Sequence, residues 1–235
     1  MKKYIGMMVV GGLVAAVAAG CASTGKARKV KESGFQPAAN YALMKKTKGD
    51  IAQLLYVNPK ANFKQYTKII VDPVTIWRVP GSKMAELPED QLHQVGAFFH
   101  DTLSAELAKE FTIVTEPQPG TLRIRAALTE ATKSQVALNM ITTVVPIGLA
   151  ISYAKDIATG THTFVGKAAA EMELTDATTG ELIAAGVAAR VGEKTISSSK
   201  LSSWGDVKAA AEKWAENTRI KLAQARDGTL QIEFE

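Results

Sequence analysis

The sequence predicts an α/β fold, a two-layer sandwich in which two long helices cover a largely antiparallel sheet of about five strands. Residues 88–107 and 203–225 carry apolar side chains at helical spacing. Residues 122–128 and 168–191 alternate between apolar and polar side chains, which is typical of strands with one buried face. Strands and helices follow one another along the chain, with one apolar insertion between strands, so we expect them to share one core.

The first predicted strand covers residues 68–77, which are rich in β-branched side chains, and Pro80 and Gly81 end it. Pro73 cannot donate a hydrogen bond to a neighbouring strand, so this strand is expected at an edge or at a bulge. The last residues of the chain, 230–234, also alternate and are expected to add a small strand.

Pro88 is expected in the first turn of the first long helix, where the acidic residues Glu89 and Asp90 suit the positive end of the helix dipole. The residues expected on its buried face are Leu92, Val95, Phe99, Leu103 and Leu107. A short strand at 111–115 and a turn at 117–120 are predicted to follow.

The central strands combine apolar faces with rows of charge. One row holds Arg123 and Arg125, and the other holds Glu171 and Glu173. We expect the two rows to meet across neighbouring strands as exposed ion pairs, on the sheet face away from the helices. The apolar sets on the opposite faces are Leu122, Ile124, Ala126 and Leu128, then Ala168, Ala170, Met172 and Leu174, and on the return strand after the 176–180 hairpin Ile183, Ala185, Val187, Ala189 and Val191.

The second long helix is predicted to begin with a capping box formed by Ser203 and Asp206. Its expected buried face consists of Val207, Ala211, Trp214, Thr218 and Leu222.

The N-terminus has the layout of a secretory signal peptide. Lys2 and Lys3 precede an apolar stretch at 5–19 that is too short for a comfortable transmembrane helix. Small residues then precede Cys21, the only cysteine, and this arrangement resembles the lipobox of bacterial lipoproteins. The resemblance implies cleavage before Cys21, acylation of Cys21 by chains such as palmitate, and a permanent membrane anchor. Because Ala22 rather than Asp follows, the resemblance favours the outer membrane, facing the periplasm.

The predicted organisation has four parts: a signal peptide at 1–20, a lipidated basic tether at 21–34, an N-terminal extension at 35–65, and the α/β domain at 66–235. Apolar residues make up 46% of the chain, which is enough for a sizeable core. The formal charge of +5 becomes +3 without Lys2 and Lys3, so we expect no nucleic-acid partner. A single cysteine excludes an intramolecular disulfide.

An apolar insertion near 136–158 interrupts the predicted strands, and residues 136–154 contain no charged side chain. Pro146 disfavours a single membrane-spanning helix, and a helix is expected only after it, at 147–158. Three alternatives stay open: packing on its own domain, contact with a partner or a second copy, and insertion into a membrane. The candidate contact patch consists of Val144, Val145, Ile147, Leu149 and Ile151.

The residue types that carry chemistry do not form a recognisable set. His93 and His100 lie two turns apart on one predicted helix, and His162 is remote, whereas zinc needs three or four converging ligands. Glu171 and Glu173 resemble a carboxylate pair, but an exposed charge row is the preferred interpretation. We therefore expect no metal, no cofactor and no enzyme activity.

Three stretches of the sequence, "YVNPKANFKQYTKIIVDPVTIW", "TGTHTFVGKAAAEMELTDATTGELIAA" and "SSWGDVKAAAEKWA", resemble the bacterial lipoprotein family catalogued as domain of unknown function 3313. The resemblance covers roughly residues 35–225. It implies an envelope location and supplies no catalytic residues. The expected function is that of a membrane-anchored adaptor or accessory subunit in an envelope assembly or transport system, with an envelope protein or a second copy as partner. The alternative is a lipid-handling or membrane-contacting protein that uses the apolar insertion.

Overall fold

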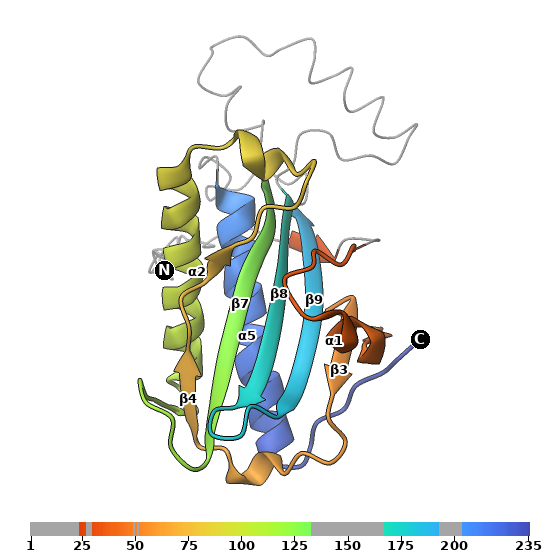
Figure 1. Cartoon of the computed structure of the whole chain (residues 1–235), viewed down its shortest axis with the longest axis vertical. Helices are drawn as coiled ribbons and strands as arrows, with labels where there is room; N and C mark the ends of the chain where they lie inside the picture. Colours follow the sequence, from red (N-terminus) through yellow and green to blue (C-terminus); the bar gives the residue numbers. More distant parts are fainter. Residues whose placement is uncertain (1–23, 27–29, 49, 51, 133–166, 193–203) are drawn as a thin grey trace, which may run out of the picture.

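The computed structural model describes residues 24–26, 30–48, 50, 52–132, 167–192 and 204–235. Two long helices, α2 (Glu89–Leu107) and α5 (Gly205–Arg226), lie on one face of a sheet, as Figure 1 shows. The N-terminal segment with the short helix α1 (Ala38–Leu43) crosses the other face. The predicted α/β class and its two long helices are confirmed, and the N-terminal segment adds a partial third layer.

The sheet has nine strands within these residues, more than the five expected. The main path consists, in spatial order, of β2 (Lys45–Lys46), β3 (Leu54–Val57), β9 (Leu182–Gly192), β8 (Lys167–Asp176), β7 (Thr121–Thr132), β4 (Lys68–Val71) and β6 (Thr112–Ile113). Off this path, β1 (Thr24–Lys26) pairs with β9, and β5 (Thr75–Ile76) pairs with β7. The additional strands are short, and three of them come from the segment before residue 58.

The sheet is mixed. The long strands β7, β8 and β9 are antiparallel as expected, but β4 and β5 run parallel to β7, and β6 runs parallel to β4. The reason is the position of α2, which separates β5 from β7 in the chain, because a helical crossover returns the chain in its original direction. The predicted strand at 68–77 is interrupted at 72–74, where Pro73 cannot donate.

The core lies between the helices and the long strands. Every residue predicted for the buried face of α2 is at most 3% exposed. The same holds for the predicted inner face of β7, from Leu122 to Leu128. Phe99 of α2 meets Trp214 of α5 with ring centroids 5.7 Å apart, so the two helices and the sheet form one core.

Helix α5 begins one residue later than predicted. Its N-cap residue is Trp204, which makes no side-chain capping hydrogen bond, and Ser203 of the predicted capping box lies outside the described residues. Of its predicted buried face only Thr218 is partly exposed. Two ion pairs also tie α5 to α2 and to the turn after it: Arg219 binds Glu106 of α2 at 2.9 Å, and Arg226 binds Glu110, just beyond α2, at 3.1 Å.

The first described strand and the end of the C-terminal tail both pair with the sheet. At the C-terminus, Phe234 forms an antiparallel bridge with Thr47, beside β2, so the predicted small strand is reduced to a single bridge. At the N-terminus, β1 lies within the segment expected as a tether. Residues 45–57 of the expected N-terminal extension supply β2 and β3.

Candidate functional site: an apolar cleft under the last helix

The charged rows lie on neighbouring strands, as predicted, but they are not an exposed set. Register pairs Arg125 with Glu173, whose side chains approach to 3.4 Å on the face away from the helices. Arg123 instead binds Asp72 at 2.8 Å. The expectation of exposed glutamates is wrong, because Glu171 is 1% and Glu173 9% exposed. The N-terminal segment covers this face of the sheet.

Glu171 holds the N-terminal segment against the sheet. Its carboxylate accepts hydrogen bonds from the Tyr41 hydroxyl at 2.5 Å and from the Ser33 amide at 2.8 Å. The Tyr41 oxygen accepts in turn from the amides of Gly34 and Gln36. Burial raises the pKa of the Tyr41 hydroxyl, and its hydrogen bond to Glu171 raises that pKa further. These residues, which we call the clasp, tie the N-terminal segment to β8 through hydrogen bonds among the backbone amides, the Tyr41 hydroxyl and the Glu171 carboxylate.

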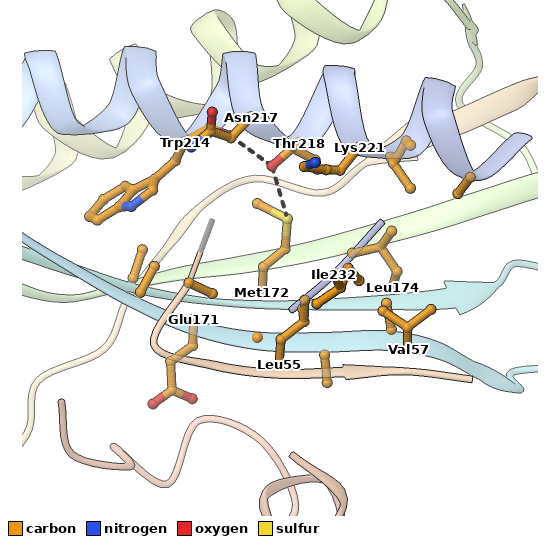
Figure 2. Close-up of a pocket in the computed structure, with 18 of the residues that line it drawn as sticks. Leu55, Val57, Glu171, Met172, Leu174, Trp214, Asn217, Thr218, Lys221 and Ile232 are labelled. Atoms are coloured by element: carbon orange, nitrogen blue, oxygen red, sulfur yellow. Dashed lines mark hydrogen bonds between the residues drawn. The ribbon is translucent and has the colours of Figure 1, made fainter. Parts of the chain in front are cut away.

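A cleft opens on the opposite face, between α5 and the strands β8, β9 and β3. It encloses about 120 Å³. Figure 2 shows Trp214 and Thr218 of α5 above it, and Met172, Leu174, Leu55 and Val57 of the strands below. Ile232 of the C-terminal tail and Phe63 close other parts of the wall. Glu171 borders the cleft only through its position on β8, because its carboxylate points away from α5 in Figure 2.

Small residues on β9 create this space. Residues directly opposite in an antiparallel pair share a face, and the register pairs Gly186 with both Met172 and Leu55. The residues of β9 that face α5 are therefore Ala184, Gly186 and Ala188. Cores normally fill the gap between helix and sheet with large side chains. Alanine and glycine cannot do so here, and the cavity remains.

The helical repeat gives the cleft a polar border. Asn217, Thr218 and Lys221 lie on the same side of α5 as Trp214 and Leu222, at spacings of three and four residues. Thr218 donates to the Trp214 carbonyl at 2.8 Å, and Asn217 donates to the carbonyl of Asp50 at 2.7 Å. Lys221 donates to Gln224 at 2.9 Å, and within the described ranges it meets no carboxylate at salt-bridge distance.

The hairpin between β8 and β9 is organised by Asp176. Burial alone would raise the pKa of Asp176, but hydrogen bonds from Thr178, Thr179 and Tyr66 outweigh it and lower that pKa to about 2. The Tyr66 bond measures 3.0 Å. This carboxylate stabilises the turn that closes at Gly180, where φ is +74°.

The two described histidines lie apart on α2, each beside an acidic neighbour. His93 lies 3.4 Å from Glu89, and His100 lies 3.0 Å from Asp101. Across the described ranges, His, Cys, Asp and Glu side chains nowhere gather in a group of three or more that could hold a metal ion. In the same part of the chain, none of the helices has the length and apolar character needed to cross a bilayer.

Several predictions fall outside the described residues. They are the acylated Cys21, the third histidine His162, the helix at 147–158, and the contact patch Val144, Val145, Ile147, Leu149 and Ile151. Conversely, sequence reasoning missed the cleft. Its signal was the run of alanine and glycine at 184, 186 and 188, together with the lysine at 221 on the apolar side of α5.

The fold and the cleft define a mixed α/β domain with a mainly apolar cavity beside its last helix. The family described as "Protein of unknown function (DUF3313)" matches residues 31–218, and the chain belongs to this family. The resemblance noted in the sequence is thereby confirmed. The comparison with curated proteins finds no match.

Three solved structures are similar to the chain at low identity. A PelC dodecamer from Paraburkholderia phytofirmans is 12% identical, with 69% of this chain and 96% of that chain covered and a TM-score of 0.38. A DUF4136 family protein from Bacteroides thetaiotaomicron is 11% identical, with coverage of 75% and 100% and a TM-score of 0.34. A DUF330 protein from Xanthomonas campestris is 8% identical, with coverage of 78% and 98% and a TM-score of 0.38. TM-scores this low are no evidence of a shared function.

Proposed function

We propose that the protein is a bacterial envelope lipoprotein, anchored through acylated Cys21, which acts by binding lipid at the membrane surface and not by catalysis. The anchor lies in the outer membrane, and the domain faces the periplasm. The signal peptide at 1–20 is absent from the mature protein. The apolar insertion near 136–158 is the part that contacts the membrane.

The observation that carries this proposal is where the described residues next to Cys21 and next to the insertion lie on the sheet. Thr24 pairs with Gly192, and Lys167 pairs with both Val191 and Thr132. Thr132 and Lys167 are the last described residues before and after the insertion. The routes to the insertion and to Cys21 therefore leave the same end of the sheet, the upper end in Figure 1.

The distance along the chain strengthens this argument. Only three peptide units separate Cys21 from Thr24, the first residue of β1, and each extended residue spans at most about 3.6 Å. The Cα atom of Cys21 can therefore lie at most roughly 11 Å from that of Thr24, which is at the sheet end from which the insertion departs. A lipid-anchored Cys21 holds that end next to the bilayer, where an uncharged apolar stretch finds an apolar environment.

The anchor is tested by replacing Cys21. In cells fed labelled palmitate, Cys21→Ser should abolish labelling and leave the signal peptide uncleaved, and Ser23→Ala should change neither. The wild-type protein should fractionate with the outer membrane. Palmitate entering the Cys21→Ser protein, or a wild-type protein that needs no detergent for extraction, would overturn the anchoring.

The second candidate is an adaptor or accessory subunit of an envelope assembly. The uncharged run that contains Val144 to Ile151 favours it, because exposed apolar patches mark partner surfaces as well as membranes. Crosslinking in intact cells separates the two. A single stoichiometric protein partner at the insertion supports the adaptor, whereas crosslinks to lipid alone support the membrane-contacting protein.

A further inference from the structure

The cleft beneath α5 has a mainly apolar wall and one charged side chain on its polar border. Leu55, Met172, Leu174 and Trp214 supply large apolar surfaces. Lys221 supplies the charge, and Glu171, the other ionisable residue at the cleft, directs its carboxylate to the far side of the sheet (Figure 2). The polarity is therefore that of a receptor for an anionic amphiphile.

We infer that this cleft binds one short-chain fatty acid, with the acyl chain between α5 and the sheet and the carboxylate on the ammonium group of Lys221. The inference rests on the proposed function, which it extends from membrane contact to the binding of one lipid molecule inside the fold.

The volume decides in favour of a single chain. An apolar cavity of about 150 Å³ holds one benzene ring, so the 120 Å³ of the cleft hold a chain of roughly five carbons. A single saturated chain of that length fills the cleft, and the two chains of a phospholipid exceed it. Apolar contact with Met172 and Trp214 provides the attraction, because ligand sites of this kind are mainly apolar with few polar groups.

The polar border selects the head group. Asn217 and Thr218 already donate to the carbonyls of Asp50 and Trp214, respectively. The ammonium group of Lys221 has three N–H donors, and one of them donates to Gln224, which leaves two for a ligand. Lys221 is partly buried and has no carboxylate partner in the described ranges, so its ammonium group favours an anionic head group, and a carboxylate matches its single charge.

The test uses the full lipidated chain in isolated membranes. Two probes carry the same six-carbon chain with a photoreactive group: one ends in a carboxylate and the other in a hydroxyl group. After irradiation, mass spectrometry locates the labelled peptides. We expect the acid to label residues 170–174, 184–188 and 214–225 about fivefold more than the alcohol does, as one partly exposed charge interaction of about 1 kcal/mol allows.

Matched variants separate the two parts of the site. Lys221→Gln should reduce acid labelling to the level of the alcohol, and Lys221→Arg should retain it. Lys213→Gln is the control on the same helix, because Lys213 pairs with Glu216 and does not line the cleft. Met172→Trp fills the cleft and should remove labelling by both probes. Ala188→Leu does the same with a smaller change, if Met172→Trp impairs folding.

The outcomes also distinguish this inference from the proposed function. Labelling that lies outside the cleft, survives both cleft-filling variants, or is equal for acid and alcohol overturns the fatty-acid site. Crosslinks from the insertion, residues 136–158, or from the protein's own acyl group into the cleft overturn it as well. In each case the membrane contact and the palmitate labelling of Cys21 stand unchanged. Loss of that anchoring and of all lipid crosslinks would overturn the proposed function itself.

Discussion

Replacing Tyr41 by Phe removes one oxygen from the clasp and leaves the ring in its place. The Tyr41 hydroxyl is the centre of three hydrogen bonds, one donated to Glu171 and two accepted from the amides of Gly34 and Gln36. Both Tyr41 and Glu171 are almost fully buried, at 8% and 1% exposure. The substitution therefore leaves polar groups that water does not easily reach.

The expected cost follows from these contacts. A hydrogen bond to a charged group contributes about 1.5–3 kcal/mol, and an orphaned buried donor adds about 1 kcal/mol or more. We therefore expect Tyr41→Phe to reduce the free energy of unfolding by about 3 kcal/mol. Glu171→Gln retains the size of the side chain and one acceptor oxygen, and should cost about 1–2 kcal/mol.

A double-mutant cycle isolates the contact between the two side chains. If the hydroxyl and the carboxylate interact directly, the double variant should be more stable than the sum of the two single effects predicts, by about 1–2 kcal/mol. Urea unfolding of the mature chain carrying Cys21→Ser provides the free energies. Trp77 offers a local signal, because its indole donates to the Ser33 carbonyl at 3.1 Å and should report release of the N-terminal segment.

Tyr56→Phe is the matched control. Tyr56 lies on β3, and its hydroxyl makes no hydrogen bond among the described residues, so the same chemical change should cost less than about 0.5 kcal/mol. A coupling energy below about 0.5 kcal/mol between Tyr41 and Glu171, or an equal cost at Tyr56, would refute the clasp as a stabilising contact.

Three further outcomes are expected. The pKa of Asp176 lies at about 2 instead of 3.8, which corresponds to about 2 kcal/mol of stability. That stability is present above the unfolded pKa and is lost as the pH falls towards 2, so Asp176→Asn should cost about 2 kcal/mol at pH 7 in urea unfolding, and its deficit should shrink between pH 4 and 2. Leu103→Ala, at a fully buried position of α2, should cost about 2–5 kcal/mol in the same assay, and a cost below 1 kcal/mol would contradict the described core. Val145→Asp in the chain without its anchor should leave the monomer folded and abolish binding to phospholipid vesicles, measured by co-sedimentation; unfolding would identify the insertion as core.

The sequence was sufficient for the long elements because each carries a complete periodic pattern. The buried stripe from Leu92 to Leu107 repeats every three or four residues over the whole of α2. The inner face of β7 alternates without interruption from Leu122 to Leu128. In both cases one face meets the core along its full length, so local pattern and tertiary burial agree.

The short strands and the clasp could not be predicted in the same way. β2 has two residues and β3 has four, which is too few for an alternating pattern to stand out. Glu171 has the charge of an exposed residue and is buried because a segment some 130 positions earlier in the chain folds over it. No local pattern contains that contact, and the charge of the side chain argues for the opposite environment.

The cleft illustrates a different difficulty. The apolar set on β9 that attracts notice, with Ile183 and Val187, suggested a buried face. However, Val187 lies opposite Glu171, on the side of the clasp. The small residues that alternate with Val187, Ala184 and Gly186 among them, are those that face α5. The alternating pattern therefore separated the two faces of β9 correctly. It did not show which face meets α5 and which meets the clasp, because that depends on the register with β8 and β3.

The clasp and the cleft lie back to back on the same two strands, since successive residues of a strand point to opposite faces. Glu171 binds the segment that leads to Cys21, and the next residue, Met172, lines the cleft. Attachment and ligand binding thus use different side chains of one rigid element. Each can be altered by substitution without removing the other, which makes the anchor and the cleft independently testable in this protein.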